Sequence, residues 1–231
     1  MSIAENVAVI KNNIARAAAA AGRNPEDILL VAATKMNDAE RVKEAVKAGI
    51  DICGENRVQE MLEKNEAGAY EGCPLHFIGH LQKNKVKYVV GLVSLIQSVD
   101  CRELLFAINK EATKKNIVQD VLLEVNIGNE ESKSGFTPED IPVILSEIST
   151  YSQLNVRGLM AIPPICSNPA ENRPYFEQMK QLFVDNRGKK YDNVHMDFLS
   201  MGMSGDYEEA IACGANMVRV GSAIFGARIY K

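Results

Sequence analysis

The stretch Ile28-Leu29-Leu30-Val31-Ala32-Ala33-Thr34-Lys35 decides the fold, because it is a run of apolar and small residues that ends abruptly in a lysine. Turn-forming residues bound it, with Asn24-Pro25 before it and Asn37-Asp38 after it. A continuous apolar run of this kind predicts a strand buried on both faces. Lys35 at its end either extends its stem into solvent or sits in a pocket where its amine is available for imine chemistry.

Further short apolar segments follow this strand, and a helical pattern comes after each of them. A leading helix precedes the first strand, begins at a capping box formed by Ser2 and Glu5, and ends at Gly22. Units of about 29 residues without linkers match a (β/α)8 barrel better than a doubly wound sheet. We therefore predict an α/β fold: a single-domain (β/α)8 TIM barrel over residues 1–231 with an extra N-terminal helix. The predicted strands are 28–35, 51–54, 75–79, 95–98, 121–126, 157–162, 195–201 and 217–220.

Composition excludes several classes of protein. Hydrophobic residues make up 46% and charged residues 24%, which is typical of a globular domain. A net charge of −4 gives no general attraction to nucleic acid or anionic membranes. No apolar run approaches the roughly 20 residues of a spanning helix, no signal peptide is apparent, and the five cysteines are scattered singly. We expect a cytoplasmic monomer that binds neither nucleic acid nor membrane.

Two glycine-bearing loops predict a phosphate site, because phosphate in such barrels is commonly bound after strands seven and eight. The segment 202–206 (GMSGD) follows the seventh predicted strand, and we expect Ser204 to cap the next helix. The segment 221–226 (GSAIFG) makes the equivalent turn after the eighth strand. Glycines permit close backbone approach, and free N–H groups attract anions. Either loop alone is explained equally well as a capped turn, but together they predict phosphate binding by Ser204, Gly205, Gly221 and Ser222.

Arg219 lies two residues before Gly221, so strand alternation points both residues to the same side. If that side is the barrel interior, Arg219 lies beneath the phosphate loop, where an unpartnered arginine is costly and implies a role. Strand eight closes onto strand one, so Lys35, the two loops and Arg219 form a triangle. Pyridoxal 5'-phosphate (PLP) has three matching groups, namely an aldehyde, a phosphate and a ring nitrogen.

Several segments together are characteristic of one family. They are the Lys35 strand, 54–60 (GENRVQE), 76–85 (HFIGHLQKNK), 131–135 (ESKSG), 158–163 (GLMAIP), 200–204 (SMGMS) and 219–226 (RVGSAIFG). Through them the chain closely resembles, over nearly its whole length, the pyridoxal phosphate homeostasis proteins, single-domain relatives of the alanine racemase barrel. It departs from that pattern at Met36-Asn37-Asp38, where many relatives have Thr-Lys-Pro, and at His80, where many have proline.

The resemblance implies a role for each candidate residue. Lys35 is the lysine that forms the imine with PLP, and Arg219 faces the ring nitrogen. Ser204, Gly221 and Ser222 hold the phosphate, and Asn56 lines the pocket. The implied function is intracellular PLP homeostasis or delivery without efficient substrate turnover, with PLP-dependent apo-enzymes as candidate partners and no catalytic residue.

Two enzyme functions remain as alternatives. A PLP-dependent amino-acid racemase needs a second acid–base group facing the cofactor, for which His80 is the best internal candidate. A Schiff-base aldolase would keep its lysine free of cofactor and bind a sugar phosphate in the loops. A zinc site at Cys73, His76 and His80 is not expected, because a fourth ligand is lacking and His76 falls within a strand.

Overall fold

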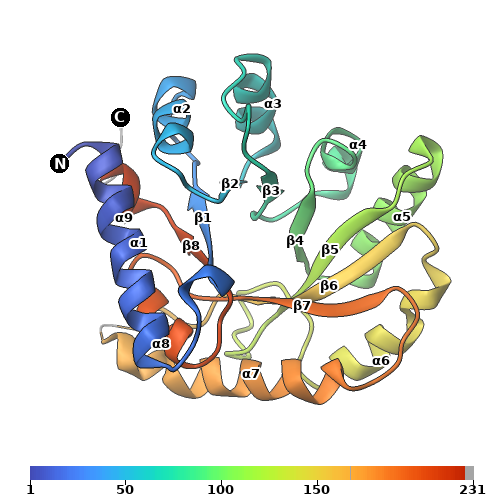
Figure 1. The fold of residues 1–231 in the computed structure, drawn as a ribbon. Helices are drawn as coiled ribbons and strands as arrows, with labels where there is room; N and C mark the ends of the chain where they lie inside the picture. The colour runs from blue at the N-terminus through green and yellow to red at the C-terminus, as the bar shows by residue number, and fades with distance from the viewer. Residues whose placement is uncertain (167, 227–231) are drawn as a thin grey trace.

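The computed structural model describes residues 1–166 and 168–226, and its eight parallel strands close into a barrel in chain order (Figure 1). This confirms the predicted (β/α)8 fold with an extra N-terminal helix. The last residues of the predicted domain, 227–231, lie outside the described part of the chain. The strands are β1 Leu29–Ala33, β2 Ile52–Glu55, β3 Leu75–Phe77, β4 Leu95–Val99, β5 Gln119–Val125, β6 Leu154–Ala161, β7 Val194–Ser200 and β8 Met217–Val220.

Helices surround the barrel and cover the outer face of its strands (Figure 1). None of the helices within residues 1–166 and 168–226 is both long and apolar enough to cross a membrane. The α-helices are α1 Ile3–Ala20, α2 Ala39–Lys47, α3 Val58–Glu66, α4 Val86–Val89, α5 Arg102–Lys115, α6 Ile141–Glu147, α7 Arg173–Arg187, α8 Tyr207–Ala212 and α9 Ser222–Phe225. Short 3-10 helices lie at Pro25–Asp27, Lys83–Lys85, Ile148–Thr150 and Pro169–Asn172.

The apolar side chains form two layers, one between the strands and the helices and a smaller one inside the barrel. The inner layer includes Val31 of β1, Leu122 of β5 and Met217 of β8. Val31 pairs with Arg219 where β1 meets β8. Met217 is two residues before Arg219 on the same strand, so the arginine also points into the barrel.

The N-terminal helix α1 packs against α8 and α9, close to where β8 pairs with β1. Its predicted capping box is present, with Glu5 N donating to Ser2 Oγ and Ser2 N donating to Glu5 Oε2. The Asn6 side-chain amide donates to the Ile224 carbonyl at 2.8 Å, so α1 holds α9 directly. The extra helix therefore stabilises the segment that follows β8.

Candidate functional site

Lys35 lies two residues beyond the end of β1, in a tight turn, and is partly buried. Asn37 N donates to the Thr34 carbonyl at 3.2 Å, which closes the turn around Lys35. Met36 has a φ of +60°, a left-handed conformation that side chains other than glycine seldom adopt. The structure therefore places Lys35 at the carboxyl end of the first strand, as predicted, within a well-defined turn.

The loop after β8 packs directly against this region. A Cβ built on Gly221 would lie 3.3 Å from Ala33 Cβ and 3.4 Å from Ala33 O, so a side chain there would be in tight contact with β1. Ala33 is the last residue of β1, two positions before Lys35. The loop containing Gly221 and the turn containing Lys35 are thus neighbours, although they come from opposite ends of the chain.

Ser204 joins the loop after β7 to the loop after β8. Its Oγ accepts hydrogen bonds from Gly221 N at 3.2 Å and from Ala223 N at 3.4 Å. Two backbone N–H groups therefore converge on one oxygen atom, which is the arrangement that binds a phosphate or carboxylate oxygen. Ala223 was not among the predicted site residues, since its contribution is a backbone N–H that no side-chain motif reveals.

The prediction that Ser204 caps the helix after β7 is wrong. The N-cap of α8 is Asp206, and the helix begins at Tyr207. Asp206 Oδ1 accepts from Met203 N at 2.7 Å, and its Oδ2 accepts from the Asn172 side chain at 2.8 Å. The carboxylate closes the loop before the helix starts, which leaves the Ser204 hydroxyl available for the loop after β8.

The two other predicted phosphate residues occupy less enclosed positions. Ser222 is the first residue of α9 and is exposed. Gly205 is also exposed, and a Cβ built on it would meet no atom within 4 Å. Gly205 borders a depression of about 230 Å³ that is also lined by Met203 and by residues 163–166. The structure thus brings Ser204 and Gly221 together but gives no steric reason for glycine at 205.

Arg219 is buried inside the barrel and bonded to its neighbours. One terminal nitrogen donates to Ser200 Oγ at 2.6 Å, and the other donates to the Ala161 carbonyl at 2.9 Å. Ser200 Oγ in turn donates to Gln97 Oε1 at 2.7 Å, and Gln97 Nε2 donates to His76 Nδ1 at 2.9 Å. The guanidinium therefore heads a chain of hydrogen bonds that crosses the barrel interior. The sequence signal for this hydrogen-bond network is the presence of His76 and Gln97 within the otherwise apolar predicted strands 75–79 and 95–98.

Burial shifts the pKa values of Arg219 and His76 in this hydrogen-bond network and of the nearby Glu124. Desolvation lowers the pKa of Arg219 to about 10, so the guanidinium stays protonated. Burial lowers the pKa of His76 to about 3, so its imidazole is neutral and Nδ1 can accept from Gln97. Burial, together with the nearby Asp100, raises the pKa of Glu124 to about 7, while Arg219 opposes that rise. The interior thus holds one firmly charged arginine near a carboxyl group that titrates close to neutrality.

Asn56 and His80 lie beyond the ends of β2 and β3. Asn56 Oδ1 is buried and has no hydrogen-bond partner within the described chain, so an acceptor remains for a ligand or water. A Cβ built on Gly79 would lie 2.3 Å from the Asn56 carbonyl oxygen, so these two loops are packed closely. His80 Nδ1 lies 3.1 Å from Asp100 Oδ2, and its side chain is 65% exposed. Among residues 1–166 and 168–226, no group of three or more His, Cys, Asp or Glu side chains is arranged to hold a metal ion.

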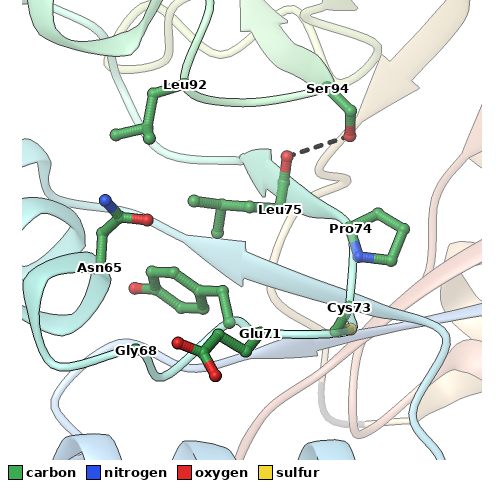
Figure 2. A pocket seen from close by; sticks show the side chains of 9 residues that line it. Asn65, Gly68, Glu71, Cys73, Pro74, Leu75, Leu92 and Ser94 are labelled. Atoms are coloured by element: carbon green, nitrogen blue, oxygen red, sulfur yellow. Dashed lines mark hydrogen bonds between the residues drawn. The ribbon is translucent and has the colours of Figure 1, made fainter.

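Another pocket, of about 470 Å³, lies at the amino ends of β3 and β4 and not at the Lys35 end (Figure 2). Leu75 is the first residue of β3, and Ser94 immediately precedes β4. The Ser94 hydroxyl donates to the Leu75 carbonyl at 3.1 Å. Asn65, Glu71 and Cys73 line the opposite wall (Figure 2). Because barrel enzymes carry their chemistry at the carboxyl ends of the strands, this pocket is separate from the Lys35 site.

The site thus combines a lysine amine, a pair of converging N–H groups and a buried arginine across four adjacent strands. Lys35 follows β1, Asn56 follows β2, and Ser204 and Gly221 follow β7 and β8. A ligand that fits must carry an anionic group for the N–H pair and an electrophile for the amine. That combination describes a phosphorylated aldehyde or ketone.

Comparison with known proteins gives one consistent result. The family model described as the alanine racemase N-terminal domain matches residues 6–229. The pyridoxal phosphate homeostasis protein of Aquifex aeolicus is 44% identical over 230 residues, which covers 100% of both chains. The protein of the same name from Escherichia coli K12 is 38% identical over 233 residues, covering 99% of this chain and 98% of the relative.

Solved structures agree with this grouping. PipY of Synechococcus elongatus, solved with PLP bound, is 30% identical and superposes with a TM-score of 0.82, covering 97% of this chain and 100% of PipY. The same protein without PLP gives a TM-score of 0.85 at the same coverage. A structure from Bifidobacterium adolescentis, described as an unknown protein, is 36% identical with a TM-score of 0.89, covering 96% of this chain and 94% of that one.

The raised pKa of Glu124 predicts a pH-dependent stability difference. Between about pH 4.5 and pH 7 the folded state keeps the Glu124 proton that the unfolded state loses, so the wild type loses stability as the pH rises through that window. The Glu124→Gln variant lacks this titration. Its stability relative to wild type should rise by roughly 2 kcal/mol between pH 5 and pH 8, as measured by urea unfolding. The exposed Glu139→Gln is the control, and a difference that does not depend on pH would contradict the shift.

Proposed function

Because the chain belongs to the family of pyridoxal phosphate homeostasis proteins, we propose that it binds PLP at the Lys35 site and maintains the cofactor supply. The observation that carries the proposal is the packing of Gly221 against Ala33, which brings the N–H pair of the β8 loop beside the Lys35 turn. PLP supplies an aldehyde that an amine can bond covalently and a phosphate that backbone N–H groups can hold.

The residues present fit the phosphate end of PLP. Ser204 Oγ already accepts from two backbone N–H groups, and a phosphate oxygen is a stronger acceptor for the same donors. A side chain on Gly221 would occupy the space between this point and β1. We assign phosphate binding to Ser204 and to the backbone of Gly221, Ser222 and Ala223, with Gly205 in the adjoining turn.

Arg219 and Asn56 fit the ring end of the cofactor. Arg219 is the buried cation of the interior, and burial leaves it protonated. A protonated arginine that donates a hydrogen bond to the pyridine nitrogen disfavours protonation of that nitrogen. The ring then lacks the protonated form that PLP enzymes use as an electron sink. Asn56 supplies the unpaired buried acceptor at the end of β2. In this proposal Arg219 weakens the stabilisation of a carbanion at the α-carbon of a bound amino acid, as suits a carrier.

The proposal extends to the protein's location and recipients. We propose that it acts in the cytoplasm as a monomer and that PLP-dependent apo-enzymes receive the cofactor. The support for this is the role named for its relatives and the absence of a strong positive charge or a spanning helix in the described chain.

A racemase function remains the second candidate because of the dyad formed by His80 and Asp100. Asp100 Oδ2 holds one imidazole nitrogen at 3.1 Å, which is how a carboxylate orients an acid–base histidine. Racemisation also requires that this imidazole reach the face of the substrate opposite Lys35. The matching family model describes only the N-terminal domain of alanine racemase, so the match by itself carries no second catalytic domain.

Lys35 should carry the cofactor. Incubation with PLP followed by borohydride should fix a phosphopyridoxyl group on the peptide that contains Lys35, as measured by mass spectrometry. Lys35→Ala should abolish the adduct. An adduct found chiefly on an exposed lysine such as Lys83 would overturn the assignment.

Gly221→Val should weaken PLP binding by tens-fold or more, because the side chain would press on Ala33 and move the N–H groups away from the phosphate. Each charge-assisted hydrogen bond contributes about 1.5–3 kcal/mol. Titration of the visible absorbance gives the affinity. Gly188→Val is the control, because a Cβ at that exposed position meets no atom within 4 Å. Equal affinity in both folded variants would remove the phosphate site from this loop.

The holo-protein should not racemise amino acids at an enzymatic rate. L-alanine and other L-amino acids are incubated with it, and the D-isomers are followed by chiral chromatography. Turnover in the ordinary range of roughly 1–10³ s⁻¹ that disappears in Lys35→Ala would establish catalysis. Its loss in His80→Gln as well would identify the second acid–base group.

A further inference from the structure

Three charged side chains from the end of β2 and from α3 surround the turn that carries Lys35. They are Glu55, Glu60 and Lys64, and between them they contact both residues that flank Lys35 in the chain. We propose that these three residues form a clamp that fixes the Lys35 turn and so sets the direction and reactivity of the Lys35 amine. This inference rests on the proposed function, because positioning Lys35 matters only if Lys35 binds the cofactor. The positioning itself can be tested without cofactor.

On one side the clamp holds Thr34. Lys64 Nζ donates to the Thr34 carbonyl at 2.8 Å and to Glu55 Oε1 at 2.6 Å. Thr34 Oγ1 donates to the same Glu55 oxygen at 2.5 Å. Thr34 is therefore held by its side chain and by its carbonyl oxygen, both through one buried ion pair.

On the other side the clamp holds Met36. Glu60 Oε2 accepts from Met36 N at 2.7 Å and lies 3.5 Å from Lys64 Nζ. Met36 adopts the left-handed conformation at φ +60°, which a methionine maintains only when its surroundings impose it. Glu60 and Lys64 are one helical turn apart on α3, so the same face of that helix reaches both sides of Lys35.

Two of the three clamp residues are buried, and Lys64 lies between the two carboxylates, so the cluster carries one net negative charge. Glu55 Oε2 is buried and has no hydrogen-bond partner among the described residues. Glu55 is fully buried, and Lys64 is 7% exposed. The three ammonium hydrogens of Lys64 have three acceptors nearby, namely Glu55 Oε1, Thr34 O and Glu60 Oε2. The Tyr70 hydroxyl is a third donor to Glu55 Oε1, at 3.1 Å, after Thr34 and Lys64. Burial together with Glu55 raises the pKa of Tyr70, so it remains a donor.

A buried ion pair is a poor source of stability, since well-packed apolar side chains of similar volume usually serve as well. The contribution of the Lys64–Glu55 pair is therefore to fix the position of the backbone that it contacts. Together with Glu60, the pair holds the backbone on either side of Lys35, whose turn lies beside the Gly221 loop. An amine that bonds a cofactor anchored at a second point needs a fixed position relative to that point. We therefore assign Glu55, Glu60 and Lys64 as positioning residues for Lys35.

The test uses two variants of the full-length protein. Glu60→Ala removes the acceptor for Met36 N at a partly exposed position, so the fold should persist. Glu55→Gln combined with Lys64→Met replaces the ion pair by neutral groups of similar size, and so avoids leaving one buried charge unpaired. Glu63→Ala is the matched control, because Glu63 is an exposed acidic residue of α3 that bonds only Gln59.

The cofactor-free readout is competitive acetylation, with mass spectrometry comparing Lys35 with the exposed Lys87 over a range of pH. A loosened turn should expose Lys35 and raise its labelling by about 3-fold or more in both clamp variants, but not in Glu63→Ala. The second readout is the rate at which PLP is captured at Lys35, which should fall by about 10-fold or more, as expected for the loss of a charge-assisted hydrogen bond. Thermal unfolding verifies that each variant is folded during the assays.

The outcomes separate the clamp from the proposed function. Labelling and capture at wild-type rates in both folded clamp variants would overturn the clamp, whatever their melting temperatures. A wild-type protein that captures no PLP at Lys35 would overturn the proposed function, and the labelling comparison would still decide the clamp. Rescue of labelling and capture by Glu60→Gln, whose amide oxygen can accept from Met36 N, would support positioning through that hydrogen bond.

Discussion

The pairing of β8 with β1 is the constraint on which the site depends. It closes the barrel, and it brings together two segments from opposite ends of the chain, because Gly221 packs closely against Ala33. The helix α1 secures the same junction through Asn6 and the Ile224 carbonyl. Arg41 strengthens it further, since it donates to Asn37 Oδ1 at 3.0 Å and also to the Phe225 carbonyl. The turn that carries Lys35 and the loop that carries Gly221 are therefore connected to the same junction by several contacts.

Two buried cations, Arg219 and Lys64, lie near the carboxyl ends of the strands. Arg219 is satisfied by Ser200 and the Ala161 carbonyl, and Lys64 is satisfied by Glu55 and the Thr34 carbonyl. Each cation contacts a backbone carbonyl near the carboxyl end of a strand, so each helps to fix the position of the strand end. Removing either cation would leave buried acceptors without a donor, which costs more than the net contribution of an ordinary hydrogen bond. Arg219 and Lys64, whose burial costs desolvation free energy, thus fix the strand ends at which the candidate site lies.

The fold was largely predictable from sequence, because apolar runs of strand length alternate with helical patterns throughout. The strand boundaries were less predictable. β6 begins at Leu154 and not at 157, because the polar residues Asn155 and Arg157 bond to Asp120 on the neighbouring strand. Ser204 was correctly placed beside Gly221 but wrongly assigned as a cap, because Asp206 competes for that position and local spacing does not decide between them. The contacts of Glu55, Lys64, Gln97 and His76 were missed, since each depends on how a strand packs against the next helix or the next strand, which the sequence pattern does not give.

A carrier and an enzyme for PLP differ in what surrounds the same lysine. Both need the amine and the phosphate contacts, and both gain from a turn held as firmly as 34–37. An enzyme also needs an electron sink at the ring and acid–base groups on both faces of the substrate. In the proposed function the cation that faces the ring is Arg219, whose guanidinium stays protonated. Among the described residues the only histidine paired with a carboxylate is His80, which is largely exposed. The proposed role as a carrier therefore assigns these residues to binding PLP and not to activating it.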